Sequence, residues 1–62
     1  MWIARDKNGA LKLHVHEPKR VDDKINQIFD SFMPYDLPQE LCPEVTWENS
    51  PRKVKSIKIE LE

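Results

Sequence analysis

The sequence predicts an α+β fold, a small two-layer domain in which a three-stranded, mostly antiparallel sheet packs against one amphipathic helix. Two patterns predict this fold. Apolar and polar side chains alternate in residues 2–16 and 54–61, as they do in half-buried strands. In residues 21–32 the apolar side chains instead recur every three or four positions, which is typical of an amphipathic helix. With 62 residues, the chain is expected to form one domain.

The first expected element is a β-hairpin over residues 2–16. The run Asp6-Lys7-Asn8-Gly9 is a strong turn signal, because Gly9 can take a positive φ at no steric cost. Placing the first turn residue opposite Ala10 predicts four cross-strand pairs: Arg5–Leu11, Ile3–Leu13, Trp2–His14 and Met1–Val15. The alternation assigns four residues to the core-facing side: Ile3, Leu11, Leu13 and Val15. The opposite side of the sheet is expected to be solvated or to serve as a docking surface.

The second expected element is a helix over about residues 21–32. Its apolar stripe consists of Val21, Ile25, Ile28, Phe29 and Phe32. Asp22 and Asp23 near its start would complement the positive end of the helix dipole. Pro34 would end the helix, because the residue before a proline is pushed out of helical conformation.

Two segments that contain prolines are expected between the helix and the last strand. Residues 37–42 are predicted to form a short helical turn, because Asp36 is a good N-cap residue and a proline follows the segment. Residues 43–51 are predicted to form an extended clamp that leads back to the sheet. Val45 and Trp47 would lie on its inward or partner-facing side.

The third expected strand covers about residues 54–61, where apolar and polar side chains alternate. Its core face would consist of Ile57, Ile59 and Leu61. Basic side chains occur here at Arg52, Lys53, Lys55 and Lys58. Lysines on an edge strand deter edge-to-edge aggregation, so a solvated face is the simplest interpretation. A nucleic-acid accessory role through these residues is the weaker alternative, since nearby glutamates dilute the charge.

Charge and size narrow the classes of function. The chain has 10 basic and 11 acidic residues, so its net charge of −1 provides no general attraction to nucleic acid or to an anionic membrane. A domain this small has little room for an enclosed cleft. We therefore expect a binding protein rather than an enzyme, with no cofactor and with neither a membrane nor a nucleic acid as its main partner.

Cys42 is the only cysteine, so no internal disulfide can form. Secreted domains of this size usually carry several disulfides. The first residues lack the apolar run of a signal peptide, and no apolar stretch approaches the ~20 residues of a membrane span. The expected location is therefore the cytoplasm. The expected role of Cys42 is packing rather than nucleophilic catalysis.

His14 and His16 are the residues closest to a metal-site pattern. Residues i and i+2 of a strand share a face, so both imidazoles could reach one ion. A third ligand would have to come from Cys42 or Glu17, and neither follows a recognised spacing. Two polar residues on a solvated strand face are the favoured interpretation, and a small metal-binding protein using His14, His16 and Cys42 is the alternative.

Four short stretches carry a resemblance to a known group of proteins. They are residues 2–9 (WIARDKNG), Leu11-x-Leu13, Leu37-Pro38 and residues 43–49 (PEVTWEN). In this order they resemble small uncharacterised proteins of intestinal anaerobic bacteria and of their phages and mobile elements. The group has no assigned activity, so the resemblance transfers no functional residues. Residues 19–33 depart from the pattern, and the helix there rests on periodicity alone.

The function expected from these observations is that of a non-enzymatic protein-interaction module. The resemblance implies a phage- or mobile-element-encoded regulator or inhibitor of a host protein. Trp2, Tyr35 and Trp47 are the aromatic residues expected to contact the partner, because aromatic side chains dominate binding hot spots. An open sheet edge could also accept a strand from another protein, including a second copy of this chain.

Overall fold

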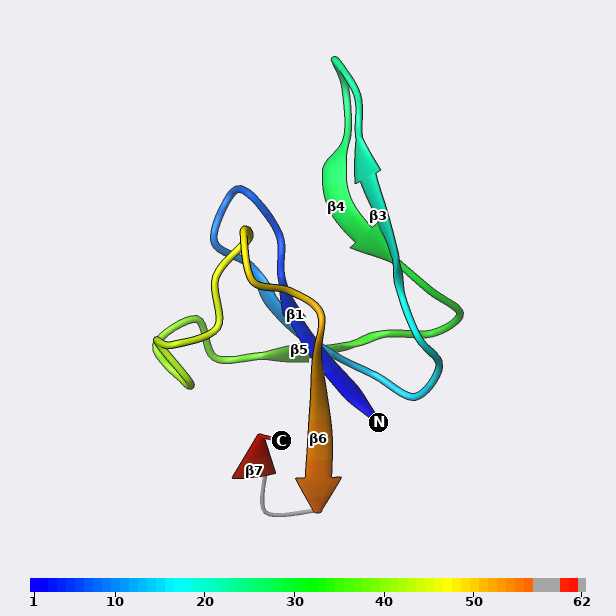
Figure 1. Cartoon of the computed structure of the whole chain (residues 1–62). Coiled ribbons are helices and arrows are strands. Elements are labelled where there is room, and N and C mark those ends of the chain that lie inside the picture. The colour runs from blue at the N-terminus through cyan, green and yellow to red at the C-terminus, as the bar shows by residue number, and fades with distance from the viewer. Residues whose placement is uncertain (57–59, 62) are drawn as a thin grey trace.

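The computed structural model describes the backbone of residues 1–56 and 60–61 and the side chains of residues 1–54. This part of the chain contains only strands (Figure 1): β1 (Trp2–Arg5), β2 (Leu11–His14), β3 (Lys19–Asp22), β4 (Gln27–Asp30), β5 (Tyr35–Leu37), β6 (Arg52–Ser56) and β7 (Glu60–Leu61). One sheet has the order β5-β2-β1-β6-β7 and the other consists of β3 and β4, with antiparallel pairing throughout. The expected α+β fold is therefore wrong, because the protein is all-β where it is described. Among the described residues no helix has the length and apolar character that a membrane span requires.

The β1–β2 hairpin has the register that its turn predicts. Ile3 pairs with Leu13 and Trp2 with His14. Gly9 has a φ of 97°, and its N–H donates to the Asp6 carbonyl at 2.9 Å. The core face is shorter than expected, because β2 ends at His14 and Val15 lies beyond it, exposed to solvent.

The expected helix over residues 21–32 is instead the β3–β4 hairpin. Val21 pairs with Ile28, and the chain reverses at Asp23, whose carboxylate accepts hydrogen bonds from the N–H groups of Ile25 and Asn26 at 2.8 and 2.6 Å. Asp23 thus caps a turn, as aspartate often does, and does not start a helix. β-branched and aromatic side chains at positions 21, 28 and 29 suit strands, which outweighs the helical spacing.

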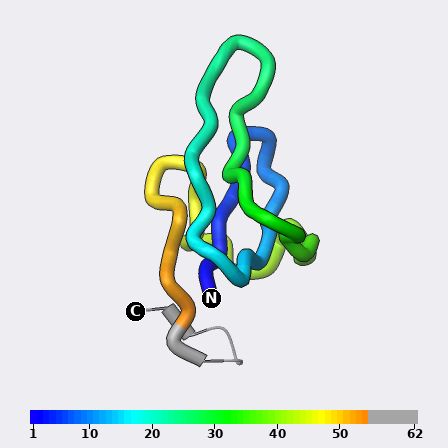
Figure 2. Tube along the Cα trace, turned by 90° about the vertical axis from the view of Figure 1, so that its right-hand side faces the viewer, coloured from blue at the N-terminus to red at the C-terminus, as the bar shows by residue number. Residues whose placement is uncertain are grey.

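The second hairpin covers the face of the larger sheet that was expected to be solvated or to dock a partner. Phe29 packs there with Ala4 and Trp47 in one buried cluster. The backbone also joins the two hairpins, since the N–H of Lys7 donates to the carbonyl of Gln27 at 3.2 Å. Figures 1 and 2 both show the turn of the β3–β4 hairpin projecting beyond the sheet.

The opposite face of the sheet holds the second buried cluster. Its buried members are Ile3, Leu11, Val45 and Val54, with Leu13, Leu37 and Cys42 packed against them. The segments over this face differ from the expected ones. Residues 37–42 start within β5 and continue into a turn closed by the Leu41 N–H and the Pro38 carbonyl at 3.1 Å, rather than a helical turn. Residues 43–51 form turns rather than an extended clamp.

The expected third strand over residues 54–61 is two antiparallel strands where it is described. Val54 in β6 pairs with Leu61 in β7, so one uninterrupted strand is wrong. Ile57, Ile59 and Lys58 lie outside the described residues. β6 pairs with β1 on its other side, which places the last part of the chain beside the first.

Candidate functional site

The three aromatic residues expected to contact a partner do not form one surface. Tyr35 pairs with Leu13 and therefore lies on the same sheet face as Ile3, and 55% of Tyr35 is exposed. Trp2 is next to Ile3 in β1, and adjacent residues of a strand point to opposite faces, so Trp2 lies on the other face, where it is half-buried. Trp47 is only 8% exposed. Tyr35 is thus the only one of the three that presents most of an aromatic ring to a partner.

Trp47 is part of the core that joins the two hairpins. Its ring centre lies 5.1 Å from that of Phe29, with a tilted geometry favourable for aromatic pairs. The guanidinium of Arg20 lies 4.0 Å from the centre of the Trp47 ring and donates from Nη1 to the Trp47 carbonyl at 3.1 Å. Burial under a cation makes Trp47 a structural staple of residues 41–51, not a contact for a partner.

The turn around Trp47 is closed by side chains. Asn49 Oδ1 accepts from the Thr46 N–H at 2.8 Å, and Thr46 Oγ1 accepts in return from the Asn49 N–H at 3.2 Å. Ser50 Oγ accepts from the N–H of Arg5 at 2.9 Å and donates to the Thr46 carbonyl at 2.5 Å. Ser50 Oγ therefore supplies an acceptor for a β1 N–H beyond the last register pair of β1 and β6, Ile3–Arg52.

Arg5 organises the loop that covers the face of the larger sheet on which Ile3 lies. Its guanidinium donates to the carbonyls of Val45 (2.5 Å), Gly9 (2.8 Å), Gln39 (2.9 Å), Leu41 (3.0 Å) and Cys42 (3.1 Å). A planar group with five donors can satisfy this many carbonyls at once. Arg5 thereby fixes residues 38–45 beside the end of β5.

His14 is fully buried, and its Nδ1 lies 2.5 Å from Ser31 Oγ. Nε2 has no hydrogen-bond partner among the described residues. Burial lowers the pKa of His14 from 6.5, Lys12 lowers it further, and the charges of Asp6 and Asp30 act against this. The neutral imidazole is therefore favoured, and it cannot contact a substrate from outside.

The residues of the alternative metal site are separated. His14 is buried under the second hairpin, His16 is exposed, and Cys42 packs against the cluster on the opposite face. Within the described part of the chain, no group of three histidine, cysteine or acidic side chains is placed to hold a metal ion. The Cys42 thiol has a raised pKa, chiefly because it is partly buried and also because Glu44 is near, while Arg5 acts in the opposite direction. It is therefore a weak nucleophile at neutral pH.

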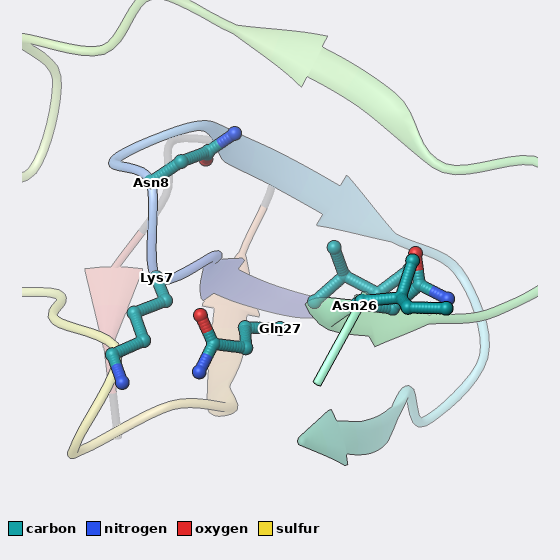
Figure 3. Close-up of a pocket in the computed structure, with 6 residues that line it drawn as sticks. Lys7, Asn8, Asn26 and Gln27 are labelled. Atoms are coloured by element: carbon teal, nitrogen blue, oxygen red, sulfur yellow. The ribbon is translucent and has the colours of Figure 1, made fainter. Parts of the chain in front are cut away.

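A surface groove of about 300 Å³ lies between the turns of the two hairpins. It is lined by Lys7, Asn8, Ile25, Asn26, Gln27 and Ile28. Figure 3 shows Lys7 and Gln27 extending from different hairpins toward the same region. The Gln27 amide already donates to Asp22 at 3.3 Å, and Ile25 at the rim is 89% exposed. The groove is open and four of its six lining residues are polar, whereas most small-molecule sites are concave and predominantly apolar.

The most exposed apolar surface next to a strand edge is the apolar edge segment, defined as residues 32–35. Phe32 is 75% exposed and Met33 63%, and Tyr35 begins β5. The φ of Met33 is 52°, a left-handed conformation that costs a residue with a β-carbon about 1–2 kcal/mol. Sequence periodicity had assigned Phe32 to the core, so this surface was missed.

β5 is an edge strand of the larger sheet. It pairs with β2 on one side, and no other described strand pairs with it. An edge strand presents unpaired backbone N–H and carbonyl groups, which are a template for another strand. The apolar edge segment and β5 thus combine two features that favour protein contact, and Arg5 holds the loop that follows them.

Acidic residues occur in the sequence before, within and after this surface. Residues 25–51 contain five acids, and all Lys, Arg and His residues lie in the rest of the chain. The five acids are Asp30, Asp36, Glu40, Glu44 and Glu48, and all are exposed. No carboxylate among them makes a hydrogen bond or ion pair with another described residue. Charge segregation was visible in the sequence, but its location beside an open edge was not.

Arg5, Asp6 and Ser50 are further residues that sequence reasoning missed, because their partners are distant in the chain. The only sequence signal was the presence of Arg5 and Asp6 in the first stretch that carries the resemblance, and Ser50 follows the last stretch directly. No protein-family model, curated protein or solved structure matches the chain.

Proposed function

We propose that the protein is a non-enzymatic protein-interaction module that binds an extended segment of another protein along β5 and the apolar edge segment. The observation that carries the proposal is the exposure of Phe32, Met33 and Tyr35 beside an edge strand. Large apolar side chains that stay exposed in one contiguous stretch mark interaction sites. Strand addition to an open edge then supplies backbone hydrogen bonds and side-chain contacts together.

Two further features support a binding role. The sheet is covered on both faces by buried clusters, so β5 is attached to a defined scaffold rather than to a mobile loop. Met33 adopts a conformation that its own side chain disfavours, and such positions cluster at ligand-binding sites. Free Cys42 is the form that a reducing compartment maintains, and the proposal therefore keeps the cytoplasm as the location.

The biological role in this proposal is that of a regulator or inhibitor of a host protein, encoded by a phage or mobile element. Only the resemblance of residues 2–9, Leu11-x-Leu13, Leu37-Pro38 and residues 43–49 supports this part of the proposal. A small rigid module with an exposed edge is suited to the role, because it can occupy a surface of its target without catalysing a reaction.

The test compares affinity capture by the tagged full chain and by two variants. Phe32→Ser with Tyr35→Ser removes both exposed aromatic side chains of the surface, while Ile25→Ser removes an even more exposed apolar side chain at the turn of the second hairpin. We expect a partner retained by the wild type and by Ile25→Ser to be lost from the double variant. Circular dichroism must show the same thermal unfolding midpoint for all three.

The proposal fails if the folded double variant retains every partner of the wild type. If only the Ile25→Ser variant lost the partner, the docking surface would be the groove between the two hairpin turns, which Ile25 lines.

A further inference from the structure

We infer that the polypeptide segment bound at β5 is cationic, with an apolar–basic–apolar alternation in which the basic side chain faces Asp36. The inference rests on the proposed function, since it specifies the chemistry of the partner at the same edge. It follows from the arrangement of charge and apolar side chains along β5.

The alternation follows from the pleat of β5. Tyr35 and Leu37 lie on one face of the sheet, and Asp36 between them lies on the other. In an added strand, the residues opposite Tyr35 and Leu37 would therefore face apolar side chains. The residue between them would face a carboxylate, for which Lys or Arg is the favourable cross-strand neighbour.

The acidic residues before, within and after β5 also favour a cationic partner segment. Asp30 precedes the apolar edge segment, Asp36 is the central residue of β5, and Glu40 lies in the turn that follows. The nearest cation in register with Asp36 is Lys12, whose ammonium lies 3.7 Å from Asp6 in an ion pair. An exposed carboxylate creates a negative potential that extends over about one Debye length, ~8 Å at physiological salt. That potential would accelerate the association of a cationic segment.

Of the described basic residues, Lys12 in the neighbouring strand and Arg5 lie near β5, and both are engaged: Lys12 pairs with Asp6, and Arg5 binds backbone carbonyls of the loop after β5. Arg52 and Lys53 belong to β6, which is separated from β5 by two strands, and Lys19 and Arg20 belong to β3 in the other sheet. The larger sheet therefore has an acidic edge at β5 and basic residues toward its other side. Among the described residues, the cation in register with β5 is Lys12, and its ammonium is paired with Asp6.

A second copy of the chain is a poorer occupant of this edge. If two β5 strands paired about a two-fold axis at Asp36, the two Asp36 carboxylates would lie directly opposite each other. Like charges in that position destabilise a sheet. A symmetric dimer through β5 is thus disfavoured by the same residue that selects a basic partner.

The experiment uses two short blocked peptides as probes, one alternating valine with lysine and one alternating valine with glutamate. Each is titrated into the ¹⁵N-labelled full chain, and amide chemical shifts report the site and the Kd. We expect the lysine peptide to shift the amides of Tyr35, Asp36 and Leu37 and to bind at least tenfold more tightly than the glutamate peptide. Its affinity should fall as salt is added.

Three variants test whether the Asp36 carboxylate selects the basic peptide. Asp36→Asn should weaken binding of the lysine peptide about threefold to fivefold, as expected for removal of one exposed charge pair of up to about 1 kcal/mol. Glu48→Gln removes the same charge in the turn around Trp47 and should leave the affinity unchanged. Asp36→Lys should reverse the preference between the two peptides.

The outcomes separate the inference from the proposed function. Equal binding of both peptides at β5 would overturn the cationic preference and leave edge-strand docking intact. Lysine-peptide shifts confined to other acidic residues, or no binding of either peptide, would overturn the inference, and the Phe32 and Tyr35 variants would then judge the proposed function alone. A concentration-dependent dimer that shifts the β5 amides without peptide would also overturn it.

Discussion

The carboxylate of Asp6 accepts a hydrogen bond from the backbone N–H of Phe29 at 2.9 Å, across 23 residues of sequence. Asp6 is buried, and its second oxygen lies 3.7 Å from the ammonium of Lys12. One side chain at the end of β1 therefore ties the second hairpin to the sheet. This contact is part of the packing by which the β3–β4 hairpin covers the Ala4 face of the larger sheet, while β5 remains an open edge.

Replacing Asp6 with alanine is expected to lower the free energy of unfolding by about 2 kcal/mol, because the buried Phe29 N–H loses its acceptor. Asp6→Asn keeps an acceptor at the same position and should cost less. Urea unfolding followed by circular dichroism measures both. Equal losses for the two variants would show that the charge of Asp6, and not its hydrogen bond, holds the hairpin.

Arg5→Lys is expected to loosen the loop over residues 38–45 and to lower the free energy of unfolding by about 2 kcal/mol. Lysine has three donors on a flexible stem and cannot reproduce the planar arrangement that reaches five carbonyls. Amide hydrogen exchange should become faster at Leu41 and Val45, whose N–H groups close turns there. Arg52→Lys in β6 is the control, and unchanged exchange in Arg5→Lys would contradict the prediction.

Trp47→Ala is expected to lower the free energy of unfolding by about 3–5 kcal/mol, the usual cost of deleting a buried aromatic ring. A chain of this length has about 3–9 kcal/mol of stability in total, so this variant should lose a third or more of it and unfold at a clearly lower temperature than the wild type. Trp47→Phe retains a ring beneath Arg20 and should lose less. Thermal unfolding followed by circular dichroism distinguishes the two, and a Trp47→Ala midpoint equal to that of the wild type would show that Trp47 is not a staple.

The protein is expected to lose stability as the pH falls below about 6.5, the reference pKa of His14. Burial lowers the pKa of His14 in the folded chain, more than Asp6 and Asp30 raise it, and Lys12 adds to the lowering. Between that lowered pKa and 6.5, the unfolded chain binds a proton that the folded chain excludes. The free energy of unfolding therefore decreases with falling pH through this window and does not recover below it.

Thermal unfolding between pH 7 and pH 5, measured for two single variants, tests this prediction. His14→Gln should flatten the dependence near pH 6, while exposed His16→Gln should leave it as in the wild type. If the His14→Gln variant keeps the full dependence of the unfolding midpoint on pH, the loss of stability is due to another titrating group.

The sequence predicted the β1–β2 register because the controlling interactions are local. A turn with glycine at its last position sets the pairing, and the alternation of Ile3, Leu11 and Leu13 then determines the buried face. The same method was wrong for residues 21–32. Their apolar positions fit a helical stripe, but Ile25 and Phe32 in that stripe are the two most exposed of the large apolar side chains that the structure describes. Periodicity in a short segment does not distinguish a helix from a hairpin when the turn residues inside it are overlooked.

The candidate site depended even more on contacts between distant residues. Tyr35 was among the predicted contact residues and is exposed beside the open edge, whereas Trp2 and Trp47 were assigned to the same surface by residue type alone. Burial of Trp47 requires Arg20 and Phe29, which belong to the other sheet. Residue type identifies a side chain able to bind a partner, but only packing decides whether it remains available.

The sequence by itself determined the first hairpin, the absence of Lys, Arg and His from residues 25–51 and the presence of a single cysteine. These properties depend on neighbouring residues or on composition. Only the tertiary structure decided that the β3–β4 hairpin covers one face of the larger sheet, that Arg5 and Asp6 bind distant backbone groups and that β5 is an edge strand. The reason is that a residue's burial and hydrogen-bond partners are set by chain segments brought together on folding, and local sequence carries little information about which segments will meet.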